Sequence, residues 1–103
     1  MASKQFDLAG ALTEKGFEKV SEIHEGKNVY ITFSKSYEKE AELAWYGKDT
    51  VRFTATVSVA LWDSGKGYSV LASFSNGKVK EYAYDKRAYN AIADTIKYNG
   101  FSI

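Results

Sequence analysis

Few residues in this sequence carry reactive side chains. It contains no cysteine, which excludes disulfides, zinc–thiolate sites, iron–sulfur clusters and thiol catalysis. Its single histidine, His24, lies in the stretch His-Glu-Gly-Lys, where we expect a turn between strand-like segments. One imidazole without cysteine does not make an ordinary zinc site, and no spacing in the sequence resembles one. We therefore expect no metal ion and no other cofactor.

Two further stretches contain residue types that bind ions. Residues 64–67, Ser-Gly-Lys-Gly, are similar to a phosphate-binding loop, but they lack the glycine spacing and the following helix that would cradle a phosphate. A hairpin turn explains them better. Glu38, Glu40 and Glu42 could bind a cation or a basic partner, although such charges more commonly face solvent and discourage edge pairing. No set of nucleophile, base and orienting group can be named, so we expect the protein not to be an enzyme.

The start of the chain combines a predicted helix with Gly16-Phe17 and strand-like segments. This order resembles the small toxin ribonucleases of the HicA type, which have a fold like that of double-stranded-RNA-binding domains. Those ribonucleases rely on a Gly-Ser-His arrangement at the start of a strand. The matching stretch here, residues 24–28, reads His-Glu-Gly-Lys-Asn and lacks that order, so the resemblance implies no activity.

The bulk composition is that of one small globular domain. The chain has 103 residues, of which 45% are hydrophobic and 26% are charged, so we treat residues 1–103 as a single domain. Its formal net charge of +1 gives no overall attraction to nucleic acid or to a membrane surface. The first residues contain no apolar run like a signal sequence, and no stretch is long enough to span a bilayer. Together with the absence of cysteine, these features favour a cytoplasmic protein.

Residues 51–62 alternate almost without exception between apolar and polar side chains. Because neighbouring side chains of a strand point to opposite faces, this pattern predicts a long strand with one buried face and one solvated face. The predicted buried set is Val51, Phe53, Ala55, Val57, Val59 and Leu61. Arg52 and Trp62 fall on the solvated side.

Turn residues divide the end of the sheet into strands that match this alternation. Asn76-Gly77 predicts a two-residue hairpin turn, which places Phe74 opposite Val79. A four-residue loop at 64–67 then places Val57 opposite Phe74. The apolar positions agree across the three strands, and a slip of one residue would mix the two faces.

The segment 37–46 fits two interpretations. Its composition is that of a helix, but its alternating pattern favours a strand, with turns at 34–36 and 47–49. Residues 18–24 could add a short strand. The expected sheet is an antiparallel meander of about five strands, at residues 28–33, 37–46, 50–62, 68–75 and 78–84.

Two amphipathic segments, residues 6–17 and 85–101, are predicted helices with the same ending. In each, an apolar residue is followed by a stretch that ends in glycine and phenylalanine, which is the pattern of a Schellman closure. The apolar pairs are Leu12 with Phe17 and Ile96 with Phe101. We expect both helices to pack on the apolar face of the sheet, which gives a two-layer α+β domain.

The uncovered face of the predicted sheet is the expected binding surface. In the expected register, one corner collects an aromatic and aliphatic patch of Trp62, Leu71, Tyr82 and Tyr84, with Arg52 and Lys80 on the same face. Two structural explanations compete with binding: cross-strand stabilisation, and burial of the corner under residues 18–27. Lys39 and Glu81 break the pattern because they fall on the apolar side.

This patch supports three functional hypotheses. The first is a small non-enzymatic protein-binding module with the general character of an inhibitor or an anti-defence protein, such as an anti-CRISPR, or of an accessory protein of a phage or mobile element. The second is a single-stranded nucleic-acid-binding protein, in which aromatic rings stack on bases while Arg52, Lys78 and Lys80 contact phosphates. The third is self-association to a homodimer. No residue pattern identifies the partner protein.

Overall fold

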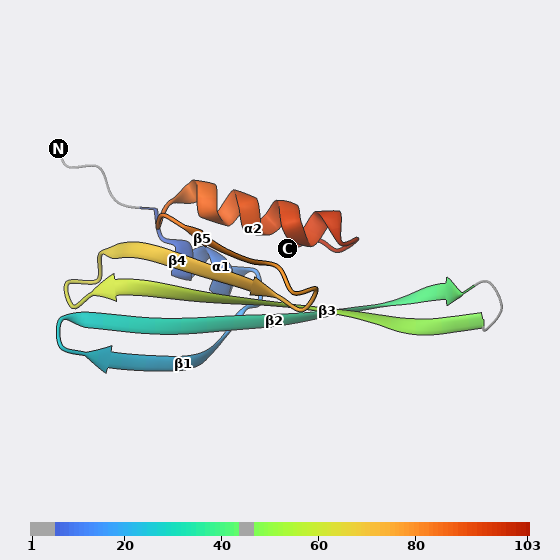
Figure 1. The fold of residues 1–103 in the computed structure, drawn as a ribbon, viewed down its shortest axis with the longest axis horizontal. Coiled ribbons are helices and arrows are strands. Elements are labelled where there is room, and N and C mark those ends of the chain that lie inside the picture. The colour runs from blue at the N-terminus through green and yellow to red at the C-terminus, as the bar shows by residue number, and fades with distance from the viewer. Residues whose placement is uncertain (1–5, 44–46) are drawn as a thin grey trace.

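The computed structural model describes residues 6–43 and 47–103 of the chain. They form a five-stranded antiparallel sheet in the order β1-β2-β3-β4-β5, with one helix before it and one after it in the chain (Figure 1). The elements are α1 (Leu8–Glu14), β1 (Glu18–Glu25), β2 (Asn28–Leu43), β3 (Gly47–Trp62), β4 (Gly67–Phe74), β5 (Val79–Tyr82) and α2 (Lys86–Tyr98). The α+β class, with a meander sheet and an N-terminal and a C-terminal helix, is confirmed.

Both helices end in the closures that the sequence predicted. At the end of α1 the Phe17 N–H donates to Leu12 O at 3.0 Å, and at the end of α2 the Phe101 N–H donates to Ile96 O at 3.1 Å. The glycine before each phenylalanine has a positive φ, 95° and 90°, which a residue without Cβ adopts at no steric cost. Asp85 caps the start of α2, since its side chain accepts from the backbone N–H groups of the first turn. Local sequence therefore sets both ends of α2.

The hydrophobic core lies between one face of the sheet and the two helices. On β3, Phe53, Ala55, Val57 and Val59 are buried, and the residues between them are only half-buried. They share one core cluster with residues of α1 and α2, among them Leu8, Leu12, Ile92 and Ile96. The predicted alternation is thus confirmed for residues 53–59. It is wrong for Val51, which lies on the arm and is 38% exposed, and Leu61 is only half-buried. We call the buried face the helix side of the sheet and the opposite face the outer face.

The strand boundaries before β3 differ from the expectation. No turn occurs at 34–36, because β2 runs unbroken from Asn28 to Leu43 and pairs with β3 along its whole length. The polar residues at 34–36 include no glycine or proline, and they gain a full ladder of backbone partners by staying extended. No turn occurs at 47–49, because these residues belong to β3, whose Gly47 pairs with Leu43. Residues 44–46 of the predicted strand lie outside the described residues. Residues 18–25 form β1, which makes the count of five strands.

The hairpin of β2 and β3 extends beyond the rest of the sheet as a two-stranded arm (Figure 1). The pairing of β1 with β2 stops at Ser34, and the pairing of β4 with β3 stops at Ala55. The arm explains the long axis of 58 Å and the radius of gyration of 15.7 Å, against about 13 Å for a compact chain of 100 residues. At its base, the ring of Phe101 lies 5.5 Å from that of Tyr37 and 6.0 Å from that of Phe53. The C-terminal residues therefore anchor the arm to the core.

Candidate functional site

The outer face is the largest surface of the sheet that no helix covers. The sheet register places most of the exposed large apolar side chains of the described residues on this face: Ile23, Tyr30, Trp62, Tyr68, Leu71 and Val79. They come from all five strands. β1 lies beside β2 as the sheet edge rather than folding over the face, so burial under residues 18–27 is contradicted. An exposed apolar surface of this extent is more typical of a contact site than scattered apolar residues are.

Three of these residues form an aromatic cluster, which we define as Tyr30, Trp62 and Tyr68. The rings of Trp62 and Tyr68 stack with centroids 4.2 Å apart and an interplanar angle of 25°. The Tyr68 hydroxyl donates to Asn28 Oδ1 at 2.8 Å. A side-chain hydrogen bond with Tyr30 raises the pKa of Tyr68. These contacts hold the rings of the cluster in fixed positions on the outer face.

The position of Tyr68 depends on a β-bulge that the sequence analysis missed. Ala60 pairs with Ser69 and Leu61 pairs with Gly67, which leaves Tyr68 as the extra residue of β4. The bulge follows a three-residue loop, since the Trp62 N–H donates to the carbonyl of residue 66 at 2.8 Å and the glycine at position 65 has a φ of 91°. A glycine as the third loop residue is the sequence signal for this type of hairpin. It would have predicted the loop, but not the bulge that then pairs Ala60 with Ser69.

A shallow groove of about 290 Å³ lies next to the aromatic cluster. It is lined by Tyr30, Ser58, Val59, Ala60, Ser69, Leu71 and Glu81. Small side chains of β3 and β4 form its floor, the ring of Tyr30 stands on β2, and Leu71 and Glu81 stand toward β5. Its volume lies at the lower limit for small-molecule pockets, so it is suited to one side chain rather than to a larger ligand.

The predicted patch of four residues does not form, because β5 is shifted by one residue. The Phe74 N–H donates to Lys78 O at 2.9 Å, so the loop has three residues rather than two, and Gly77 takes a φ of 90°. Tyr82 then lies opposite Val70 and not opposite Leu71. A one-residue shift exchanges the two faces of a strand. Tyr82 and Tyr84 were therefore wrongly placed on the outer face, and Trp62 and Leu71 remain there with exposures of 45% and 44%.

The same shift places Tyr84 in the core. Its side chain is only 8% exposed, and its hydroxyl accepts a hydrogen bond from the Ala9 N–H at 3.2 Å. Burial raises the pKa of the phenol, and the bond from Ala9 opposes that effect. Tyr84 thus connects the end of the sheet to α1 and serves the fold. The shift also moves Glu81 to the outer face, where it lies opposite Leu71, although it was expected on the apolar side.

The two predicted cationic residues are not beside the aromatic cluster. Arg52 lies on the arm, where its Nε is 2.9 Å from Glu38 Oε1. Lys80 lies on the helix side opposite Ala72, with its Nζ 5.6 Å from the centre of the Tyr82 ring. Glu38 is therefore engaged in a cross-strand ion pair, and Glu40 likewise faces Lys48 at 3.9 Å. The arm accounts for these charges as pairs of opposite sign across one hairpin.

The outer face of the five-stranded region is acidic. Outside the arm, the register of the described strand residues places three carboxylates and no lysine or arginine on this face: Glu18, Glu25 and Glu81. On the arm, the same face carries both signs of charge: Glu38, Glu40, Glu42, Lys48 and Arg52. Glu81 accepts a hydrogen bond from Ser69 Oγ at 3.3 Å. None of the three carboxylates outside the arm has an ion-pair partner within residues 6–43 and 47–103. The face thus carries a local negative charge although the whole chain carries +1.

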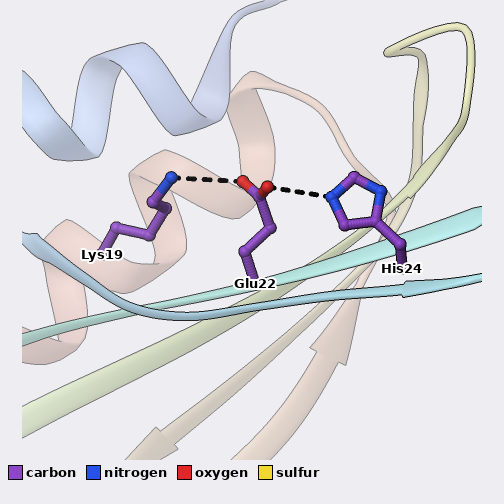
Figure 2. A network of polar contacts seen from close by, with 3 residues as sticks. All are labelled: Lys19, Glu22 and His24. Carbon is purple, nitrogen blue, oxygen red and sulfur yellow. Dashed lines mark hydrogen bonds and ion pairs between the residues drawn. The ribbon is translucent and has the colours of Figure 1, made fainter.

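A second group of polar side chains lies on β1 (Figure 2). The register places them on the helix side of the sheet, opposite to the groove. Glu22 is 3.2 Å from Lys19 Nζ and 2.9 Å from His24 Nε2. The bond to His24, followed by that to Lys19, lowers the pKa of Glu22. All three side chains are exposed, and the described residues contain no group of acidic, histidine or cysteine side chains that could hold a metal ion. The network is a surface ion-pair cluster on the edge strand.

Comparison of the chain with known protein families, with curated proteins and with solved structures gives no match. None of the helices in the described part of the chain is long and apolar enough to cross a membrane.

Proposed function

We propose that the protein is a non-enzymatic protein-binding module that contacts its partner with the outer face of its sheet. The observation that carries this proposal is an uncovered five-stranded face with apolar side chains on every strand, including the fixed stack of Trp62 and Tyr68. Aromatic residues held in place lose little conformational entropy on binding and are enriched among the residues that dominate protein interfaces.

The size of the face fits such a role. Four of the five strands are paired over about eight residues and β5 has only four, so at a spacing of about 4.8 Å the face covers about 450 Å² in projection. A typical specific protein interface buries about 800 Å² on each partner. The relief of the side chains and the neighbouring loops supply the remaining area.

The charge of the face separates this proposal from the two alternatives. Nucleic acid needs cations beside the aromatic rings, and the outer face offers carboxylates instead. A second copy of the chain, packed face to face, would bring unpaired carboxylates such as Glu81 close to one another. A different protein with a complementary surface meets neither obstacle.

The test is affinity capture with position-specific variants. The protein carries a photo-crosslinking residue at position 71 in one preparation and at the exposed helix position 90 in a control. We expect a defined protein adduct from position 71 alone, and loss of that adduct in a Trp62→Ala variant. Tyr98→Ala is the matched control because Tyr98 is 92% exposed on α2. Equal adducts from both positions, or capture that Trp62→Ala leaves intact, would reject the outer face as the binding surface.

A further inference from the structure

We propose that the groove between Tyr30 and Glu81 receives a lysine or arginine side chain of the partner protein. This inference rests on the proposed function and adds the chemistry of the partner's contact. Glu81 supplies the decisive feature. It is a carboxylate at one end of an apolar groove, and no ion pair satisfies it among the described residues.

The shape of the groove fits a long side chain with a charged end. The groove crosses the strands from Tyr30 on β2 to Glu81 on β5, which is about 14 Å at the usual spacing of strands. Between these two ends the groove is lined by uncharged side chains, among them Ala60, Ser69 and Leu71, which offer methyl, methylene and hydroxyl groups. The aliphatic stem of a lysine or arginine lies on such a surface while its charged end stays at the rim.

The electrostatics of the site select a cation. The Ser69 hydroxyl donates to Glu81 Oε1 at 3.3 Å and orients the carboxylate. The nearest lysine of the same strand, Lys80, points to the other side of the sheet and interacts with the Tyr82 ring. Glu18 and Glu25 add negative charge to the same face. A partner with basic residues is thus complementary both to the groove and to the surface around it.

The experiment uses the purified full chain and short probe peptides, so it does not require the partner. The probe is acetyl-Gly-Arg-Gly-amide, and the matched peptides replace arginine with lysine, with its neutral isostere citrulline, or with glutamate. Amide shifts at Ala60, Ser69 and Leu71 are followed by NMR during titration. We expect saturable shifts with the arginine and lysine peptides that weaken as salt is added, and at least several-fold weaker binding of the citrulline peptide. Equal shifts with arginine and citrulline, or none with either basic peptide, would overturn the proposal.

Two variants complete the test. Glu81→Gln keeps the size of the side chain and is expected to weaken the basic peptides by about two- to five-fold, the range of an exposed ion pair. Glu40→Gln, on the arm, removes one negative charge elsewhere and should leave the titration unchanged. The two proposals can fail separately. If Glu81→Gln still captures the partner with full strength while Trp62→Ala does not, the cation site is rejected and the protein-binding function stands. If folded Glu81→Gln weakens both peptide binding and partner capture, and folded Trp62→Ala loses partner capture, both proposals are supported.

Discussion

The ring of Tyr84 lies against the backbone of Gly67 so closely that a Cβ on residue 67 would overlap three of its ring atoms. The contact joins the start of β4 to the segment between β5 and α2. Tyr84 also accepts a hydrogen bond from Ala9, so one side chain connects α1 to the start of β4. It exists because the three-residue loop at 75–77 turned this tyrosine inward.

Gly67→Ala is therefore expected to destabilise the protein by about 1–3 kcal/mol, the range for overpacking a filled core. Chemical denaturation measures the change. In a Tyr84→Ala background the same substitution should have a much smaller effect, because the ring that it would strike is gone. An equal loss in both backgrounds would show that the contact does not limit residue 67.

Tyr37 carries a buried hydroxyl that has no hydrogen-bond partner among residues 6–43 and 47–103. An unpaired buried polar group lowers stability by about 1–3 kcal/mol, so Tyr37→Phe should leave the free energy of unfolding unchanged or raise it by about 1 kcal/mol. Tyr84→Phe is the matched control, since it removes a hydroxyl that is bonded and should lower stability by about 1 kcal/mol. Denaturant titration of both variants gives the answer. A Tyr37→Phe protein clearly less stable than the parent would mean that the hydroxyl has a partner.

Stability should fall at alkaline pH because burial raises the pKa of Tyr37 from 10.0 to about 12. Below pH 10 both the folded and the unfolded chain keep the phenol proton, so the full contribution is present. Between pH 10 and pH 12 the unfolded chain releases a proton that the folded chain retains, and the free energy of unfolding decreases as pH rises. Thermal unfolding between pH 9 and pH 12 should show this decline. Tyr37→Phe should make it shallower, with the buried Tyr84 responsible for part of the remainder.

The two faces of the sheet should differ sharply in their tolerance of substitution. Ile92 is fully buried on the helix side, so Ile92→Ala is expected to lower stability by about 2–5 kcal/mol. Leu71 is 44% exposed on the outer face, and Leu71→Ala should change stability by less than about 1 kcal/mol. Comparable losses from the two substitutions would mean that the outer face is covered by part of the same chain.

The two faces of β3 and β4 could be predicted from the sequence even though the predicted pairing was wrong, because the register was wrong by two residues. Val57 was expected opposite Phe74 and lies opposite Ala72, yet both partners belong to the helix side. The side chains of a strand repeat with a period of two, so a shift by two residues keeps every face. The core of β3 and β4 could be predicted for this reason in spite of wrong partners.

The candidate site could not be predicted to the same degree. Trp62 and Leu71 were placed correctly on the outer face, but Tyr82 and Tyr84 were not, and Tyr68 was missed. Each failure traces to a glycine loop of three residues in place of the loop length that was assumed. One residue of loop length exchanges the faces of β5, and the bulge beside the other loop adds Tyr68 to the outer face.

The sequence by itself determined the local structure and the division of the central strand into two faces, because capping residues, glycine closures and alternating polarity act over a few neighbouring residues. Only the tertiary structure decided which side chains meet on the outer face. That outcome depends on loop geometry and on competition between strands for backbone partners, as when β2 stayed extended through 34–36 to pair with β3. Such long-range pairing is a property of the whole sheet, and it brought Glu81, rather than the expected tyrosines, to the groove.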